Sequence, residues 1–462
     1  MCVVNVSIWN HCRTSNQGPR LFPQQTAHLV WKRGVKQIHE EVGIIILTIL
    51  TRQMSHTSNG DPLSQELKRG TLLSPRRRTG GCYYFVPECY FIIAKILYYR
   101  KDWVGNAVFE NMIMPGPRPF ILFFNPVRHA VPFYHQLQKV ARTEVVTSKS
   151  REEFYSDLQK KYKDISIIYR TSASGAVAGN FDADLIQHLP SSCKHICHNG
   201  AGYDQIDVNA CAKRGITVTY APDPVTEATA DLSIWLMLGA LRQLNPSLNS
   251  LRTGKFKTGL DFGHDPQGKI LGILGMGRIG RAIKKRAEPF GLITKYHNRK
   301  PLSSDQAAGA EYVSFEKLLA ESDIISINVP LNAQTKGLIG EKEISQMKDG
   351  VVIVNTARGA IIDEAAMAKA LDSGKIASVG LDVYENEPHV NERLLGNDRA
   401  LMVPHLGTHT VETLAKMETW AMENARRAAL GEKLLSPVPE HVHVQMIRDY
   451  RRVDWLFRVV DR

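Results

Sequence analysis

The sequence is poor in cysteine, with seven among 462 residues and none after Cys211. An odd, irregularly spaced set cannot form a complete disulfide framework, so we predict reduced thiols in a reducing compartment. In "CKHICH" (residues 193–198) three residues separate the two cysteines, whereas zinc and haem motifs usually place two between them. No second pair lies nearby, so we predict a structural role for these thiols and no metal site.

Long hydrophobic runs are also missing. The segment "VGIIILTIL" is much shorter than the roughly 20 residues of a membrane span, and Pro87, Glu88 and Lys95 interrupt residues 82–99. The first 39 residues contain no Asp or Glu, as in a mitochondrial presequence, but they lack a clear amphipathic, Arg-rich helix. We therefore predict no membrane partner and a cytoplasmic location, with a mitochondrial one less favoured.

The central part of the chain lacks an excess of positive charge, although the net charge is +12. Residues 1–115 hold 14 Lys and Arg against 7 Asp and Glu, and residues 441–462 hold 5 against 3. The remaining residues hold 39 against 36. Because nucleic-acid binding needs a basic surface, this distribution predicts no nucleic-acid partner.

Regular patterns begin only near residue 118. Residues 1–115 show no sustained periodicity, and we predict that they and residues 441–462 are disordered extensions or artefacts of gene prediction. From "RPFILFFNP" onward, strand-like segments such as "DISIIYR" and "ITVTYAP" alternate with helical ones such as "REEFYSDLQKKY". This alternation predicts a parallel sheet with helices on its faces.

A second alternating series follows a long helix predicted over residues 225–244. Its strands include "ILGILG", "LITKY", "DIISINV", "GVVIVN", "IASVGLD" and "ALMVP". We predict an α/β fold with two doubly wound parallel-sheet domains. The first comprises residues 116–223 and the second residues 224–403, and residues 404–440 return to the first domain.

Three glycines in "GILGMGRIG" lie between a strand pattern and a helix pattern. Gly275 permits a tight turn, Gly277 lets the backbone approach a pyrophosphate, and Gly280 lets the helix pack on the strand. The helix N-terminus would then offer free N–H groups to the phosphates. A glycine-rich turn without a ligand is the alternative, but this context favours a Rossmann-type NAD(P)-binding domain.

The acid that usually binds the ribose of NAD, about twenty residues after the glycines, is missing. The chain reads Asn298, Arg299 and Lys300 at that point. These residues offer hydrogen-bond donors and two positive charges, which suit a 2′-phosphate. A solvated basic turn is the alternative. The position favours NADPH as the cofactor, with NAD possible.

Three polar residues follow successive predicted strands: Arg358, Glu387 and His405. Ligands bind beyond the carboxyl ends of parallel strands. Reduction of a 2-oxo acid needs a cation for the carboxylate and carbonyl, which Arg358 offers, and a proton donor, which His405 offers. Glu387 would orient His405 and raise its pKa. Considered alone, Arg358 could form a surface ion pair, Glu387 could be a solvated carboxylate and His405 could be a buried structural imidazole. Together, the three residues favour catalysis.

Several segments resemble the D-isomer-specific 2-hydroxyacid dehydrogenases, most closely the glyoxylate and hydroxypyruvate reductases of fungi. They are "GILGMGRIG", "NVPL", "VNTARGAIIDE", "GLDVYENEP", "PHLGT", "HNGAGYDQIDV" and "EATADLSIWLMLGALR", and the resemblance covers residues 118–439. It implies the catalytic trio Arg358, Glu387 and His405. It also implies an NAD(P)-binding domain inserted in a flavodoxin-like substrate domain, and a homodimer.

The resemblance also implies binding residues. A substrate loop would hold the carboxylate through backbone N–H groups at Asn199, Gly200, Ala201 and Gly202. Besides the glycines and residues 298–300, cofactor contacts are expected at Arg278, Ile279, Val329, Pro330, Thr335, Thr356, Ala357, Asp382, Gly407 and Thr229.

We therefore predict a dehydrogenase that reduces a small 2-oxo acid, glyoxylate or hydroxypyruvate, with NADPH. The loop at residues 170–179 is expected to line the substrate pocket, but its small residues do not separate glyoxylate from branched 2-oxo acids. A nucleotide-sensing regulator of the corepressor type stays open, because such proteins can retain the trio. Formate dehydrogenase is disfavoured, because it pairs its catalytic His with Gln where this chain has Glu387.

Overall fold

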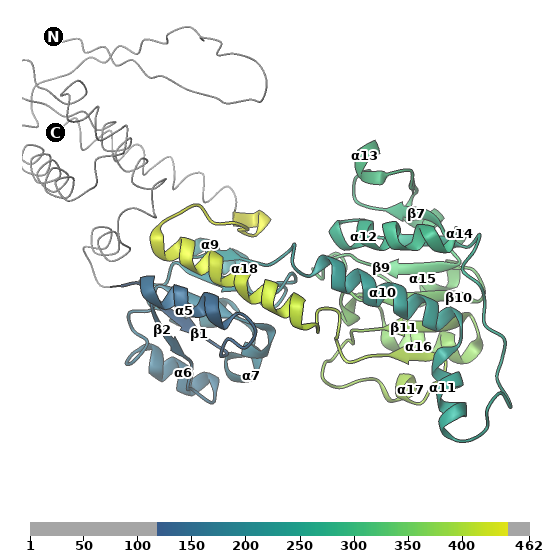
Figure 1. Ribbon diagram of the computed structural model, residues 1–462, viewed down its shortest axis with the longest axis horizontal. Coiled ribbons are helices and arrows are strands. Elements are labelled where there is room, and N and C mark those ends of the chain that lie inside the picture. Colours follow the sequence, from purple (N-terminus) through teal and green to yellow (C-terminus); the bar gives the residue numbers. More distant parts are fainter. Residues whose placement is uncertain (1–117, 442–462) are drawn as a thin grey trace, which may run out of the picture. The chain divides into compact units, whose positions relative to one another are not determined.

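The computed structural model describes residues 118–441 (Figure 1). The predicted extensions, residues 1–115 and 441–462, lie outside the described residues, except for His441. The described chain forms two sheets in which every strand pairing is parallel. This confirms the predicted α/β fold with two parallel sheets.

The first sheet has five strands in the order β2-β1-β3-β4-β5. This is the strand order of flavodoxin-like folds, and it brings the carboxyl ends of β1 and β3 side by side. The strands are β1 (Phe120–Phe123), β2 (Arg142–Val145), β3 (Ile167–Arg170), β4 (His195–His198) and β5 (Thr217–Thr219). The helices are α5 (Val131–Val140), α6 (Arg151–Leu158), η1 (Ser172–Ser174), α7 (Gly175–Ala178), α8 (Ala183–His188) and α9 (Val208–Lys213).

Both faces of the first sheet are covered by helices, which explains why its inner strand β1 is apolar without interruption. In β1, Phe120 and Leu122 pack with residues of α6, α8 and α9. Ile121 and Phe123 face the other side and pack with α5 and with α18 (Val411–Leu430). Alternate residues of one strand therefore belong to two separate cores.

Helix α18, near the C-terminal end of the described residues, covers one face of the first sheet (Figure 1). Its buried Glu418 accepts the backbone N–H groups of Arg128, His129 and Ala130 at 2.7–3.0 Å. These groups lead into α5, which has no N-cap side chain of its own, so Glu418 supplies the cap from another helix. His441 is also buried against this domain, where its ring accepts the Val218 N–H at 3.0 Å.

The second sheet has seven strands in the order β12-β11-β10-β9-β6-β7-β8. Counted from β6, this is the doubly wound order of dinucleotide-binding domains with one further strand at the edge. The strands are β6 (Ile270–Leu274), β7 (Ile293–His297), β8 (Glu311–Tyr312), β9 (Ile324–Ile327), β10 (Val351–Asn355), β11 (Ile376–Leu381) and β12 (Ala400–Met402).

Two groups of helices cover the second sheet. One face packs against α10 (Thr226–Leu241) and α12 (Arg278–Ala287), which lie side by side in Figure 1. The other face packs against α14 (Phe315–Glu321), α15 (Glu341–Gln346) and α16 (Glu364–Ser373). The remaining short elements are α11 (Leu244–Arg252), η2 (Glu288–Phe290), α13 (Ser304–Ala307), η3 (Gly359–Ile361), α17 (Glu392–Leu395) and η4 (Pro439–His441).

Some elements differ from the sequence predictions. The long helix predicted to residue 244 ends at Leu241, because Gln243 adopts a left-handed backbone with φ of 53°. The chain then continues as the separate helix α11. Helix α5 and the short strands β2 and β8 were not predicted; β2 and β8 have no buried residues, so they carry little hydrophobic signal.

Three negative or neutral findings bear on function. No helix within residues 118–441 has the length and apolar character needed to cross a membrane. Over the same range, no three His, Cys, Asp or Glu side chains gather as a metal site would require. Cys193, Cys197 and Cys211 are buried free thiols, and burial raises their pKa to about 12, which makes them unreactive.

Candidate active site

A histidine and a glutamate form a hydrogen-bonded pair beyond the carboxyl ends of β11 and β12. His405 Nδ1 donates to Glu387 Oε2 at 2.8 Å. The other carboxylate oxygen of Glu387 accepts the backbone N–H of Tyr384 at 3.0 Å, which fixes the carboxylate. Because Nδ1 is engaged, Nε2 is the nitrogen that faces away from the pair, and it makes no hydrogen bond to any residue in the described range.

This pair favours the charged form of both partners. The hydrogen bond that His405 donates to Glu387 raises the pKa of His405 above its ordinary value, and this outweighs the opposing effect of burial. Burial alone would raise the pKa of Glu387, but the hydrogen bond and positive charge of His405 hold it below its ordinary value. His405 is therefore suited to carry a proton at neutral pH and to deliver it from Nε2.

The turn that carries His405 is fixed by Asp382. The Asp382 carboxylate is buried and accepts the backbone N–H groups of Leu406 at 2.5 Å and Gly407 at 2.8 Å. The His405 N–H donates to the backbone carbonyl of Asp382 at 2.8 Å. These bonds hold His405 at a φ of 55°, a conformation that non-glycine residues rarely adopt. Asp382, an expected cofactor contact, thus also orients the histidine.

Arg358 follows β10 and reaches the glycine-rich loop that follows β4. Its Nε donates to the Asp204 carboxylate at 3.0 Å, and its Nη1 donates to the Ala357 carbonyl at 2.7 Å. The positive charge of Arg358 lowers the pKa values of both His405 and Glu387. The three predicted catalytic side chains are therefore close enough for the Arg358 charge to act on the other two.

Two glycines of the predicted substrate loop are required by close neighbours. A Cβ on Gly202 would lie 1.7 Å from Nη2 of Arg358, and a Cβ on Gly200 would lie 2.6 Å from Nε2 of His198. Ala201, between them, is half-buried. Asn199 is anchored at the loop start, where its side-chain amide donates to the Tyr169 hydroxyl at 2.9 Å. The loop backbone therefore runs close beneath both side chains.

His198 was not among the predicted site residues, although it ends β4 directly before this loop. Its side chain is 3% exposed, and Nε2 donates to the Gly202 carbonyl at 2.9 Å. Burial and the nearby charge of Arg170 lower its pKa to about 3, so the ring is neutral. The signal in the sequence was a polar residue at the end of a buried strand, next to glycines.

Arg170, at the end of β3, is a buried cation that makes no hydrogen bond to a carboxylate within residues 118–441. Its Nε donates to the Ser174 hydroxyl at 3.0 Å and its Nη2 to the Gln205 side chain at 2.8 Å. The guanidinium also lies 4.9 Å from the ring centroid of Phe181. Burial lowers its pKa to about 10, so it remains cationic at neutral pH. It was expected only as part of the pocket-lining loop.

The glycine loop between β6 and α12 fits a dinucleotide pyrophosphate. Gly275 has a φ of +93°, and a Cβ there would lie 2.8 Å from the Asn328 backbone and from Val329. A Cβ on Gly280 would lie 2.7 Å from the Gly275 carbonyl. Space around Gly277 is open, and α12 begins without a side-chain cap. The first N–H groups of α12 are therefore available to phosphate oxygens.

The basic turn after β7 is tied to this loop. Asn298 accepts the Met276 backbone N–H through Oδ1 at 2.7 Å. Arg299 and Lys300 are exposed, and neither makes an ion pair or side-chain hydrogen bond with residues 118–441. Their charges are therefore not neutralised by a described partner, and they lie beyond the strand next to the glycine loop.

Several expected cofactor residues use their side chains within the protein. The Thr356 hydroxyl lies 2.7 Å from that of Ser233 on α10, and Thr229 donates to the Gly407 carbonyl at 3.4 Å. Thr335 donates to the Pro330 carbonyl at 2.6 Å. These bonds connect the strand-end loops to each other and to α10, so cofactor contacts there would be made mainly by backbone groups and the remaining faces of these side chains.

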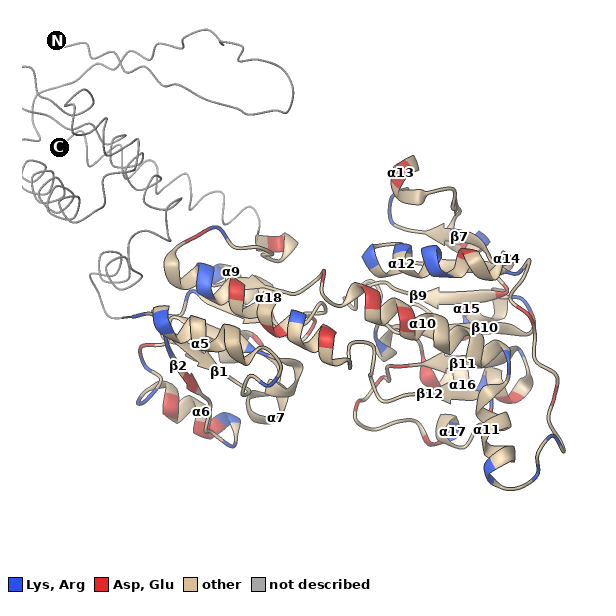
Figure 2. Cartoon of the chain, in the orientation of Figure 1, with Lys and Arg blue, Asp and Glu red and all other residues tan. Residues whose placement is uncertain are grey.

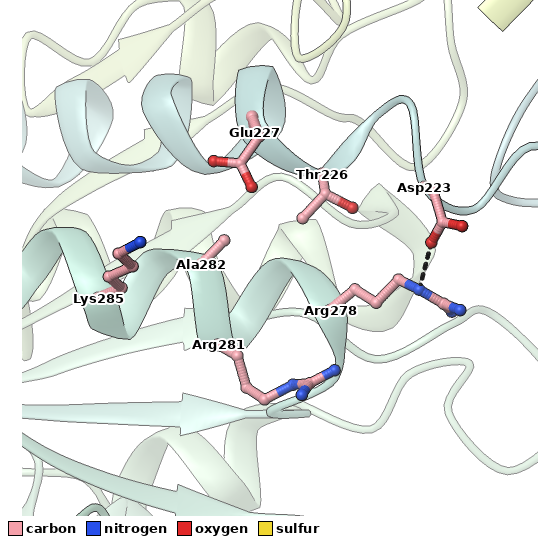
Figure 3. A pocket seen from close by; sticks show the side chains of 7 residues that line it. All are labelled: Asp223, Thr226, Glu227, Arg278, Arg281, Ala282 and Lys285. Carbon is pink, nitrogen blue, oxygen red and sulfur yellow. Dashed lines mark ion pairs between the residues drawn. The ribbon is translucent and has the colours of Figure 1, made fainter. Parts of the chain in front are cut away.

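A charged groove runs between α10 and the start of α12 (Figure 3). Arg278 points across it, and its Nε lies 2.6 Å from the Asp223 carboxylate (Figure 3). Figure 2 shows the concentration of Lys and Arg on α12. Ile279, the next residue, is partly buried against the core. The Arg278 guanidinium is thus engaged at the edge of the glycine loop. The groove lining is Asp223, Thr226, Glu227, Arg278, Arg281, Ala282 and Lys285.

Known proteins are similar to this chain in both sequence and fold. The family profile for "D-isomer specific 2-hydroxyacid dehydrogenase, NAD binding domain" matches residues 234–407. The chain is 48% identical over 327 residues to 4-methyl-2-oxopentanoate reductase A of Aspergillus oryzae, covering 71% of this chain and 99% of that relative. A crystal structure of a glyoxylate reductase from Paecilomyes thermophila is 49% identical, with a TM-score of 0.69, covering 71% of this chain and all of that chain.

A more distant structure was solved with ligands. The NADPH-dependent glyoxylate/hydroxypyruvate reductase of Sinorhizobium meliloti, in complex with NADP and malonate, is 30% identical with a TM-score of 0.62. The match covers 70% of this chain and 97% of that chain. Because the matches span these relatives almost completely, the chain belongs to the D-isomer-specific 2-hydroxyacid dehydrogenase family and is an oxidoreductase with an NAD(P)-binding Rossmann domain.

Proposed function

We propose that the protein reduces a small 2-oxo acid to the D-2-hydroxy acid with NADPH as the cofactor. The observation that carries this proposal is the 2.8 Å pair of His405 and Glu387, with the Arg358 charge acting on both. A cationic imidazole beside a guanidinium suits a substrate that has a carboxylate and a carbonyl oxygen that becomes an alkoxide.

The roles follow from the donors that remain free. Arg358 binds the substrate carboxylate and polarises the carbonyl through its remaining N–H donors, and the N–H groups of the loop at residues 199–202 hold the carboxylate from the other side. His405 delivers a proton from Nε2 to the oxygen as negative charge develops there. Glu387 stabilises the imidazolium beforehand and orients the ring after the proton has left. When bound, the reduced cofactor supplies the hydride.

The preference for NADPH is supported by the turn at residues 298–300. Arg299 and Lys300 are exposed and unpaired within the described chain, and the Asn298 side chain attaches the turn to the glycine loop. Two cations at this point would bind a 2′-phosphate, and no acid stands there to repel it. The Sinorhizobium relative, solved with NADP, supports the same preference.

The substitution Arg299→Asp tests the cofactor preference. It should lower the NADPH-to-NADH ratio of kcat/KM by about 10- to 100-fold, the range expected for loss of a charged hydrogen bond. Lys342→Asp, the same change at an exposed cation on α15, is the control and should leave the ratio unchanged. A wild-type protein that prefers NADH, or an unchanged ratio in Arg299→Asp, would contradict the proposal.

We propose glyoxylate or hydroxypyruvate as the substrate. The names of the Paecilomyes and Sinorhizobium relatives support this choice, whereas the Aspergillus relative is named for a branched 2-oxo acid. NADPH oxidation should therefore be measured with glyoxylate, hydroxypyruvate and 4-methyl-2-oxopentanoate. A higher kcat/KM with the branched acid would contradict the substrate assignment. No oxidation with any 2-oxo acid would favour the nucleotide-sensing regulator instead.

We also propose that residues 116–223 and 404–440 form the substrate domain and that residues 224–403 form the cofactor domain.

We propose a cytoplasmic homodimer as well. Large apolar side chains are exposed on α10, on α11 and in the segment after α11, which supports a covered surface there. They are Trp235, Leu248, Leu251, Phe256 and Phe262, the last 97% exposed. Light scattering after size exclusion should give twice the chain mass; a monomer would contradict the dimer.

A further inference from the structure

We propose that Asp204 is a positioning residue that orients the Arg358 guanidinium for the substrate. This inference rests on the proposed function, because it concerns the same site. It starts from the bond between Arg358 Nε and Asp204 Oδ1 at 3.0 Å, which joins the loop after β10 to the loop after β4. The side chains of Arg358 and Asp204 are 28% and 20% exposed, so most of the surface of each is shielded from solvent.

Two of the three guanidinium nitrogens are held by the protein. Nε donates to Asp204 and Nη1 donates to the Ala357 carbonyl, whereas Nη2 makes no hydrogen bond to residues 118–441. A guanidinium is planar, so fixing two nitrogens fixes the direction of the third. The contacts of Nε and Nη1 therefore fix the direction in which Nη2 points.

The free nitrogen lies against the substrate loop. The missing Cβ of Gly202 would lie 1.7 Å from Nη2 and 2.6 Å from Cζ of Arg358. Gly202 thus provides the space, and Asp204, two residues later, provides the anchor. The loop is held in turn by His198, which donates to the Gly202 carbonyl at 2.9 Å. One short segment therefore forms the expected carboxylate pocket and also aims the cation into it.

Asp204 has a second cation within electrostatic range. Burial lowers the pKa of Arg170, and the negative charge of Asp204 partly opposes this effect. A loss of activity after removal of Asp204 could therefore act through either arginine. Of these two arginines, Arg358 alone donates a hydrogen bond to the Asp204 carboxylate, so the positioning role assigns the effect to Arg358. A double-mutant cycle separates the two routes.

The experiment compares Asp204→Ala, Asp204→Asn, Arg358→Ala and the double variant Asp204→Ala/Arg358→Ala. Asp204→Ala should lower kcat/KM for the 2-oxo acid by about 10- to 100-fold, as for a displaced catalytic group, with KM for NADPH unchanged. Asn keeps an oxygen that accepts from Nε, so it should restore much of the loss. In the Arg358→Ala background, removal of Asp204 should cost less than about threefold, because residues that act as a unit are not additive.

Controls separate orientation from folding. Asp207 lies in the same segment and caps α9 by accepting the Ala210 N–H at 2.8 Å, away from Arg358. Asp207→Ala should lower the melting temperature and leave kcat/KM within twofold. Wild-type kcat/KM in Asp204→Ala, or full additivity in the cycle, would overturn the positioning role. Wild-type activity in Arg358→Ala would instead overturn the proposed function itself, so the two failures are distinguishable.

Discussion

Two histidines, one at the end of a strand in each sheet, have opposite ionisation. His405, beyond β12, donates to a carboxylate and has a raised pKa. His198, the last residue of β4, donates to a carbonyl and has a pKa lowered to about 3 by burial and by the nearby charge of Arg170. The comparison shows that position at a strand end does not decide the ionisation of a histidine; its burial and the charges beside it do.

The difference suits the separate roles that we propose for the two histidines. A histidine next to a carboxylate can gain and lose a proton near neutral pH, so it can take part in chemistry. A buried neutral histidine with a fixed tautomer keeps one hydrogen bond over the whole physiological range, so it suits the support of a loop. The predictions that follow test these roles, from the largest expected effect to the smallest.

Replacement of His405 by Gln should have the largest effect. Gln keeps a polar side chain but cannot donate a proton as an acid, so kcat should fall by about 10²- to 10⁴-fold, the usual contribution of general acid catalysis. Binding of NADPH, measured by fluorescence titration, should change little. His409→Gln, four residues later in the same loop, should retain wild-type kcat. A His405→Gln enzyme within tenfold of wild-type would remove the proton donor from the mechanism.

Replacement of Glu387 by Gln should make the two histidines more alike. The raised pKa of His405 keeps it protonated to higher pH, so loss of the carboxylate should move the alkaline limb of kcat/KM for reduction to lower pH. At neutral pH the rate should fall by about 10- to 100-fold, as for a lost charged hydrogen bond. The exposed neighbour Glu385 offers a control, since Glu385→Gln should leave the profile in place. An unmoved limb in Glu387→Gln would mean that His405 does not set it.

Replacement of His198 by Gln should act mainly on stability. In the unfolded chain His198 binds a proton below pH 6.5, whereas the folded chain keeps it neutral down to about pH 3. Stability is therefore lost as pH falls from 6.5, by at most about 1.4 kcal/mol per pH unit from this group. Thermal unfolding of His198→Gln should show a shallower pH dependence between pH 6.5 and 5, with the pH limbs of kcat/KM unmoved. Parallel unfolding curves would show that His198 titrates normally.

Much of the fold was predictable from the sequence because most of its strands are buried on both faces and its helices are amphipathic or apolar. Strands such as β10 are continuous apolar runs, and the polar residues after such strands led to the prediction of Arg358, Glu387 and His405 as site residues. The glycine loop was predictable for a different local reason: at Gly275 and Gly280 the neighbouring atoms leave no room for a Cβ.

Other features had no local signal. Nothing near Glu418 indicates that it caps α5, nearly three hundred residues earlier. Nothing in the local sequence distinguishes Asp204 and His198 from other polar residues. Asp204 contacts Arg358, which follows β10, and the pKa of His198 depends on Arg170, which ends β3. Thr356 and Thr335 were expected only as cofactor contacts, and their hydrogen bonds within the protein were not foreseen.

The sequence by itself determined the alternation of the apolar strands with helices, the glycine loop and the identity of the polar groups at the ends of those strands. These depend on local hydrophobic pattern and on backbone freedom, which each residue carries with it. Only the tertiary structure decided which of those groups are paired, which are buried without a charge partner, and which donors stay free. Ionisation and orientation depend on distances of a few ångströms between segments far apart in the chain, and folding alone sets those distances.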